Sequence, residues 1–294
     1  MDRHRIVSFL AVTYAFTWTV QAVLVLLGLE ASWTLSLLVG LGGFGPAIGA
    51  AVVVWASGGS LRAWFSQMLD WRIGWRWWVV VLGLPLVILA TGSLLFVLGG
   101  GPVDLGSFES PAVYLFVLAW GTVLGGGQEE LGWRGFMLPV LQERYSALAS
   151  SLVVGVAWAG WHLPLFLNAN TTHGGWALSQ QLLWVGSIMA GSIIWTWLYN
   201  GTGGSVLAVA VGHAGVNGMG VYHPADLAAM APGGVPDPAL NLLAEVTGAI
   251  PLVVLAVLIV AVYGGRRLAA RERPGVEHVG LDRSGDGGGP TPSD

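Results

Sequence analysis

Five ionisable side chains lie inside apolar stretches of this sequence: Glu129, Glu130, Arg134, His162 and His213. Ionisable groups are costly to bury in the hydrocarbon of a membrane, so each one is a candidate for function. A buried carboxylate is suited to take a proton from water, and an imidazole can hold a ligand or a developing anion. The residue types therefore favour chemistry on a water molecule inside an apolar environment.

The first group is the run Glu129-Glu130-Leu131-Gly132-Trp133-Arg134. On a helix, Glu130 and Arg134 are four residues apart and share a face, so they can form an ion pair that lowers the cost of burying both. Glu129 points about 100° away and is free to face another partner. An ion pair that only joins helices explains Glu130 and Arg134, but it leaves Glu129 unexplained.

Two histidines form the second and third groups. His162 follows Trp158 by four residues, and a lone histidine in an apolar helix is more often a hydrogen-bonded core residue than a catalyst. His213 and Asn217 are also four apart, hence on one helix face. That pair could hold a ligand or an oxyanion, or it could join helices by hydrogen bonds.

Helix geometry predicts that the three groups lie at one depth. At a rise of 1.5 Å per residue, Glu129 is about 20 Å before the charged turn at 143–144, and His162 is about 20 Å after it. His213 lies roughly 12 Å from the polar turn at 200–204 by the same measure. All approach the middle of the membrane, so we expect them to form one site.

The elements that position these residues are predicted to be membrane-spanning helices. The chain has 54% hydrophobic and only 10% charged residues, whereas a soluble domain carries about a quarter charged residues. Its mean hydropathy is +0.70. A span needs about 20 apolar residues. The sequence thus predicts an all-α polytopic membrane protein of about eight spans, near 7–28, 34–56, 77–98, 114–141, 147–167, 179–199, 204–221 and 243–263.

The arginines predict the orientation. All twelve basic residues are arginines, and eleven of them lie before the first span, in alternate loops or after the last span. By the positive-inside rule both termini are cytoplasmic. Arg134, inside a span, is the exception. The basic start and apolar run of the first segment also resemble a signal peptide, but its length and the lack of a convincing cleavage site favour a retained anchor.

Residues 1–263 are accordingly predicted to form a single transmembrane domain. The segment 264–294 is rich in Arg, Gly, Pro and Asp without an apolar pattern, and we expect a disordered cytoplasmic tail. Four tryptophans between 71 and 78, interleaved with two arginines, are typical of an interfacial aromatic belt, with a binding surface as the alternative.

Several classes of membrane hydrolase are disfavoured. Every aspartate is in a loop or tail, which argues against a pair of membrane aspartates. No HExxH helix occurs, so that zinc motif is absent. Ser205 precedes His213, but it has the position of a helix N-cap rather than of a nucleophile. The chain has no cysteine, which excludes thiol nucleophiles and thiolate metal sites.

Taken together, the three groups resemble the motifs of the CAAX-protease and bacteriocin-processing family. These are two glutamates, then three residues and an arginine; an aromatic four residues before a histidine; and a histidine four before an asparagine. The sequence around them, such as Trp-His-Leu-Pro-Leu-Phe, is similar as well. The resemblance covers roughly residues 110–220.

The resemblance implies an eight-helix intramembrane endopeptidase whose cavity opens to the cytoplasm. It implies that Glu129 is the general base, that His162 positions the water, and that His213 and Asn217 bind the oxyanion. Glu130, Arg134 and Trp158 would support them. A metal-free mechanism is favoured, because a ligand role for Glu129 would leave the Arg134-paired Glu130 as base. The alternative is a zinc protease with the metal on Glu129, His162 and His213.

The expected partners are the lipid bilayer and a membrane-associated peptide or protein substrate, and no nucleic acid. The lysine-free, Gly-rich composition indicates a bacterial cell membrane. The main rival is a non-proteolytic transporter or scaffold, since Gly125, Gly126 and Gly127 could break a helix as transporters do at binding sites. The absence of an inverted repeat weakens that alternative.

Overall fold

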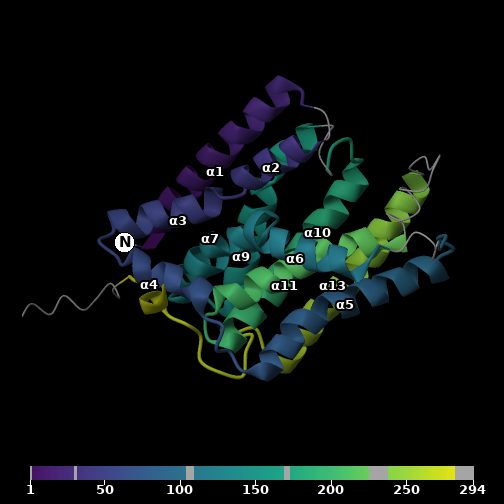
Figure 1. The fold of residues 1–294 in the computed structure, drawn as a ribbon. Helices are drawn as coiled ribbons and strands as arrows, with labels where there is room; N and C mark the ends of the chain where they lie inside the picture. Colours follow the sequence, from purple (N-terminus) through teal and green to yellow (C-terminus); the bar gives the residue numbers. More distant parts are fainter. Residues whose placement is uncertain (1, 30–31, 104–108, 169–172, 225–237, 282–294) are drawn as a thin grey trace, which may run out of the picture.

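The described residues of the chain form a bundle of helices. The computed structural model describes residues 2–29, 32–103, 109–168, 173–224 and 238–281, and these contain helices and turns but no strand (Figure 1). The α-helices are α1 Asp2–Leu27, α2 Trp33–Gly42, α3 Gly45–Ala56, α4 Leu61–Ser66, α5 Trp75–Leu98, α6 Pro111–Leu124, α7 Glu130–Gly132, α8 Leu138–Gln142, α9 Ala147–Trp161, α10 Leu178–Thr202, α11 Val206–Met219 and α13 Pro238–Tyr263.

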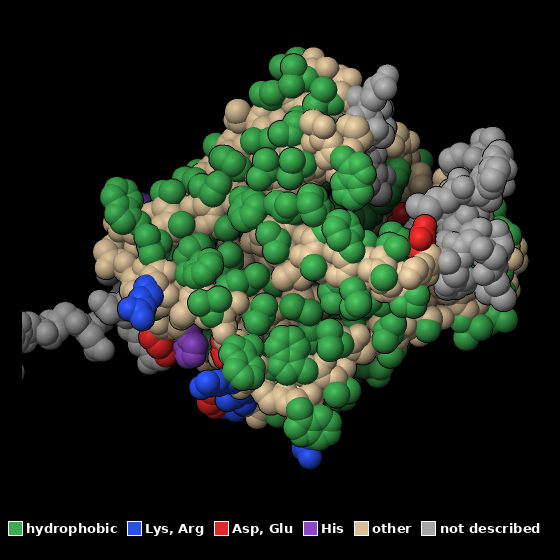
Figure 2. Space-filling view, in the orientation of Figure 1, with side chains coloured by type: hydrophobic (Ala, Val, Ile, Leu, Met, Phe, Trp, Pro, Cys, Tyr) green, Lys and Arg blue, Asp and Glu red, His purple; other side chains and the backbone are tan. Residues whose placement is uncertain are grey.

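Among the described residues, six helical segments are long and apolar enough to cross a membrane, and hydrophobic side chains are spread over the whole face drawn in Figure 2. Charged side chains are gathered mainly at one edge of that face. The expectation of an all-α, multi-pass membrane protein is confirmed. The six segments are Arg3–Leu27, Trp33–Ala56, Trp75–Leu98, Ala147–Leu167, Leu178–Thr202 and Ala239–Tyr263.

The fourth and seventh expected spans differ from continuous long helices. The fourth is interrupted after α6, where Gly126 has a φ of +118°. The chain folds back so closely that a Cβ on Gly127 would lie 2.5 Å from the carbonyl oxygen of Thr122. It then continues as a 3₁₀ turn, α7, a π-helix at Trp133–Met137 and α8. The seventh is the shorter apolar segment Val206–Tyr222.

Polar residues of α1 join it to the helices around the site. The Thr17 hydroxyl donates to the carbonyl oxygen of Gly42 at 2.8 Å, and the Trp18 indole donates to that of Trp161 at 3.0 Å. Tyr14 donates to the carbonyl oxygen of Ala157 in the same way. Two of these three bonds end on α9, so α1 holds the helix that carries His162.

The tail beyond α13 corrects one prediction. Residues 264–281 were expected to be disordered, but they pack against the ends of several helices. The carbonyl oxygens of Arg266 and Gly280 accept hydrogen bonds from the backbone amides of Ala147 and Ser60 at 3.0 and 2.8 Å. Leu268 is fully buried. Backbone hydrogen bonds and single buried side chains hold this segment in place. Its apolar residues follow neither a helical nor a strand period, so the sequence pattern did not predict that it packs. Residues 282–294 lie outside the described residues.

Candidate active site

Glu130 and Arg134 form a fully buried ion pair. The Nη1 atom of Arg134 lies 3.0 Å from each carboxylate oxygen of Glu130, and both side chains have no exposed area. This is the pairing expected from their spacing. Nη2 of the same guanidinium donates to Ser192 Oγ at 3.2 Å, and that hydroxyl donates to the carbonyl oxygen of Ser151 at 2.7 Å. The pair thus joins the π-helical segment to α10 and α9.

Trp158 connects this ion pair to Glu129. Its indole N–H donates to Oε2 of Glu129 at 2.7 Å, and the guanidinium carbon of Arg134 lies 4.9 Å from its ring centroid. Hydrogen bonds to a charged acceptor are shorter and stronger than neutral ones. One buried side chain therefore holds the Glu129 carboxylate by its edge and the Arg134 cation by its face.

His213 is held by Glu130. Its Nδ1 lies 2.7 Å from Oε1 of Glu130. A carboxylate beside a guanidinium accepts hydrogen bonds, so Nδ1 carries the proton and donates. The imidazole stacks on Trp195 with centroids 5.6 Å apart and meets Trp158 edge-on at 5.1 Å. These contacts fix the ring and leave its Nε2 for a partner in the site.

His162 is oriented in a comparable way. Its Nδ1 lies 2.9 Å from the carbonyl oxygen of Trp158, which can only accept, so this nitrogen donates. Nε2 is then the free nitrogen, and in the neutral ring it is an acceptor. Trp161 and Trp184 meet the imidazole edge-on, at centroid distances of 4.6 and 4.9 Å.

Two nitrogens converge beside Gly126. A Cβ at this position would lie 2.7 Å from Nδ2 of Asn217 and 2.9 Å from Nε2 of His213. Asn217 also donates to the carbonyl oxygen of Gly125 at 3.0 Å. Glycine allows this close approach, and its φ of +118° is one that other residues rarely adopt. The backbone of Gly126 therefore packs directly against an amide nitrogen and an imidazole nitrogen.

The structure thus brings Glu129, Glu130, Arg134, Trp158 and His213 into direct contact. His162 reaches the group through the backbone and ring of Trp158, and Asn217 lies next to His213 where both approach Gly126. The helix-depth argument correctly predicted that the three motifs meet.

Other contributors were missed by the sequence analysis. Ser192 was hidden in an apolar helix, where a single serine is common. His173 lies in a turn, with its ring 6.1 Å from that of His162 and 5.1 Å from Trp184. Burial lowers the pKa of His173 to about 4. Its place among Phe166, Trp176 and Trp184 depends on chain folding that no short spacing indicates.

The two histidines of the site have the hydrogen bonds that metal-binding histidines have, but the site residues are not gathered around one point. Both imidazoles use Nδ1 for a hydrogen bond and leave Nε2 available, as zinc-binding histidines do. Glu129 has one oxygen bonded by Trp158. Within the described ranges, however, no three His, Asp or Glu side chains are gathered closely enough to hold a metal ion.

Comparison with known proteins agrees with the resemblance expected from the motifs. Residues 110–219 match the family model described as type II CAAX prenyl endopeptidase Rce1-like. A curated relative, the CAAX prenyl protease 2 of Methanococcus maripaludis, is 31% identical over 153 residues, which cover 47% of this chain and 53% of the relative. The chain thus spans about half the length of the relative that it matches. The matched segment contains all three motifs, and the resemblance is confirmed over it.

Proposed function

From the match of residues 110–219 to a family of CAAX prenyl endopeptidases, we propose that this membrane protein is an intramembrane endopeptidase. It hydrolyses a peptide bond of a membrane-associated protein or peptide. The observation that carries the proposal is the buried pair of hydrogen bonds that join Trp158 to Glu129 and His213 to Glu130. His162 adjoins this group, because its Nδ1 donates to the carbonyl oxygen of Trp158.

The charges of the site support activation of water by Glu129. We take His213 as an imidazolium in this proposal, so that the four groups are two carboxylates, a guanidinium and an imidazolium, whose charges cancel. A neutral total is the arrangement that costs least in an apolar interior. Glu130 is occupied by Arg134 and His213. Within the part of the chain that the structure describes, the Glu129 carboxylate has only the Trp158 hydrogen bond and remains available as the base.

In the proposed reaction, a water molecule lies between Glu129 and the Nε2 acceptor of His162. Glu129 takes one proton as the water oxygen bonds to the carbonyl carbon of the substrate. The resulting oxyanion accepts hydrogen bonds from Nδ2 of Asn217 and the Nε2–H of His213, the two nitrogens that converge beside Gly126. When the C–N bond breaks, the proton held by Glu129 passes to the leaving amine.

Zinc chemistry is the second candidate, because both imidazoles leave Nε2 available. In the described structure the site side chains are not gathered closely enough for a metal. Glu129, His162 and His213 would have to move together to hold the ion, which would supply a Lewis acid and lower the pKa of a bound water molecule. In that case His213 is neutral and its Nε2 is a ligand, so it cannot donate to an oxyanion. The two candidates therefore assign opposite protonation states to the same nitrogen.

The test is proteolysis by the purified chain in lipid vesicles, followed with a library of membrane-anchored peptides. Glu129→Gln removes the base while keeping its shape and its hydrogen bond from Trp158. We expect it to lower the rate by about 10² to 10⁴, the usual contribution of general acid–base catalysis. His162→Ala should cause a comparable loss. Glu109→Gln and His4→Ala, which change exposed residues of the same types, are the matched controls.

Each protein is assayed with and without a strong chelator. Activity that survives chelation supports the metal-free mechanism, whereas loss on chelation and recovery with zinc supports the zinc alternative. Equal rates for wild type, Glu129→Gln and His162→Ala, with all three proteins folded, would refute the proposal.

A further inference from the structure

Gln128 directly precedes the two glutamates of the site, and the proposed hydrolysis gives it no role. The residue is only 3% exposed, and it lies in the 3₁₀ turn Gly127–Glu129 between α6 and α7. A buried amide has to satisfy its donors and its acceptor within the protein. The partners of the Gln128 amide therefore show what this residue holds in place.

One partner is the peptide group that joins Gly125 to Gly126. Oε1 of Gln128 accepts a hydrogen bond from the backbone N–H of Gly126 at 3.0 Å. The carbonyl oxygen of the same peptide group, that of Gly125, accepts a hydrogen bond from Nδ2 of Asn217 at 3.0 Å. A peptide group is planar and rigid, so Gln128 fixes one side of the plane whose other side holds Asn217.

The second partner of Gln128 lies on α2. Nε2 of Gln128 donates to the carbonyl oxygen of Gly40 at 3.4 Å. Gly43 leaves room for this nitrogen, because a Cβ there would lie 2.4 Å from it. The hydrogen bonds form one chain, which runs from Asn217 through the peptide group and Gln128 to Gly40. Hydrogen bonds in such a chain strengthen one another.

This chain matters for Asn217 because a side-chain amide is planar. Once one N–H is committed to the carbonyl oxygen of Gly125, the direction of the second N–H is fixed. Asn217 is exposed, so burial does not hold it. The same turn also holds the backbone of the proposed base, since the N–H of Glu129 donates to the carbonyl oxygen of Gly126 at 3.1 Å.

We propose that Gln128 is a positioning residue of the site, which orients the Asn217 amide through the peptide group between Gly125 and Gly126. This inference rests on the proposed function, in which Asn217 donates to the oxyanion. A role confined to joining α2 to the turn would account for the bond to Gly40, but not for the bond to Gly126.

The first test is steady-state proteolysis in vesicles by Gln128→Met, which keeps the length of the side chain but removes its acceptor and its donors. We expect kcat to fall about five- to tenfold, the usual worth of one hydrogen bond, with KM changed less than about twofold. Adding Gln128→Met to Asn217→Ala should cause no further fall, because Gln128 acts through Asn217. An unchanged kcat, a loss confined to KM, or two losses that multiply would each overturn the proposal.

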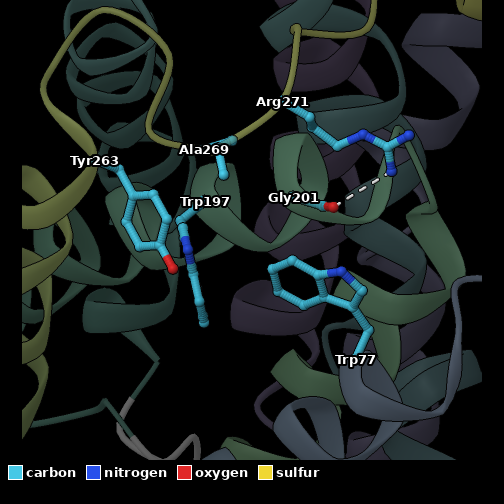
Figure 3. A pocket seen from close by; sticks show the side chains of 7 residues that line it. Trp77, Trp197, Gly201, Tyr263, Ala269 and Arg271 are labelled. Atoms are coloured by element: carbon cyan, nitrogen blue, oxygen red, sulfur yellow. Dashed lines mark hydrogen bonds between the residues drawn. The ribbon is translucent and has the colours of Figure 1, made fainter.

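Gln142→Met is the matched control, because Gln142 is also 3% exposed and also bonds through both ends of its amide. Its partner Asn200 precedes Gly201 at the end of α10. There Arg271 of the tail donates to the carbonyl oxygen of Gly201, beside a cavity of about 260 Å³ (Figure 3). This variant should lower the temperature of thermal unfolding without lowering kcat. A fall in kcat as large as that of Gln128→Met would count against a specific role for Gln128.

A second variant keeps the proposal testable if Gln128→Met does not fold. Gly43→Ala retains Gln128 but places a methyl group against its Nε2, so kcat should fall in the same way. Gly42→Ala is its control, because a Cβ on Gly42 would contact Val20 and Gln21 instead. Equal kcat values for these two alanine variants would contradict the positioning role.

A measurement without substrate separates this inference from the proposed function. In protein that contains ¹⁵N-labelled asparagine, the side-chain amide signal of Asn217 is assigned with Asn217→Ala. This signal should shift in Gln128→Met and stay in place in Gln142→Met, which should shift the signal of Asn200 instead. If wild type cleaves no peptide, the endopeptidase proposal fails, while the Asn217 signal still decides whether Gln128 positions this amide. An Asn217 signal that Gln128→Met leaves unchanged would overturn the inference.

Discussion

The buried centre and the arginine-rich end of the bundle use the same kinds of side chain with opposite consequences. In the centre, the guanidinium of Arg134 lies over the ring of Trp158 at 4.9 Å and bonds both oxygens of Glu130. At the end of the bundle, Arg76 lies over Trp75 at 5.7 Å, and both side chains are exposed.

The two arginines differ in their exposure to solvent. Water and salt screen the charge of an exposed arginine, so its removal costs little. A fully buried arginine balances a carboxylate that has no solvent-exposed area, and its removal leaves that carboxylate without its cation. Similar cation–ring geometry therefore says little about importance until burial is known. Substitutions in the buried centre and at the exposed end should differ accordingly, and they follow from the largest expected effect to the smallest.

Arg134→Met should be the most damaging, because it leaves Glu130 buried without its cation. Breaking a buried pair in this way costs about 3–5 kcal/mol of folding free energy. The measurement is thermal or denaturant unfolding in detergent. Arg134→Lys, which keeps the charge but not the contact with both oxygens, should lose less. Equal stability of Arg134→Met and wild type would show that the buried pair contributes nothing.

Asn217→Ala should lower kcat by about 10² to 10³ with little change in KM, because an oxyanion donor acts in the transition state. Asn217→Asp, which keeps the shape but loses the N–H donors, should be as slow. The check is steady-state proteolysis in vesicles. A loss confined to KM would place Asn217 in substrate binding instead.

Trp158→Phe should slow proteolysis about ten- to a hundredfold, because it removes the hydrogen bond to Glu129, and bonds to charged groups are worth about 1.5–3 kcal/mol. The phenyl ring still lies under Arg134, so the protein should fold. The matched control is Trp78→Phe, which removes an indole bond to the carbonyl oxygen of Trp71 far from the site. A rate for Trp158→Phe equal to that of the control contradicts the prediction.

Arg76→Gln should change the free energy of unfolding by less than about 0.5 kcal/mol, as exposed substitutions usually do. Proteolysis should be unaffected. Comparing its unfolding with that of Arg134→Met measures directly how much burial adds to the same cation–ring contact. A large loss in Arg76→Gln would break the comparison.

Much of the site could be predicted from spacing alone. Glu130 and Arg134 are four apart and do pair. The motifs that carry His162 and His213 meet the two glutamates, as helical rise predicted. Depth is predictable because an α-helix advances by a constant amount per residue.

Contacts that depend on rotation and on bends were not predictable. The bond between His213 and Glu130 requires the relative rotation of α11 and the segment that carries Glu130, which helical rise does not determine. The sequence suggested a break at the glycines before Glu129, but not that the chain turns back on Thr122. The packed segment 264–281 was missed because isolated residues such as Leu268 hold it without a repeating pattern.

The π-helix at Trp133–Met137 has a consequence for how the sequence can vary in length. Such a stretch corresponds to one extra residue in an α-helix, so the helix after it is turned by about 100°. Gln142 then meets Asn200 through two amide hydrogen bonds of 3.2 and 2.8 Å. Deleting one residue here would remove no proposed catalytic group, yet it would rotate Gln142 away from Asn200 or Glu130 away from His213. For this segment, the number of residues is a stricter constraint than the identity of most of them.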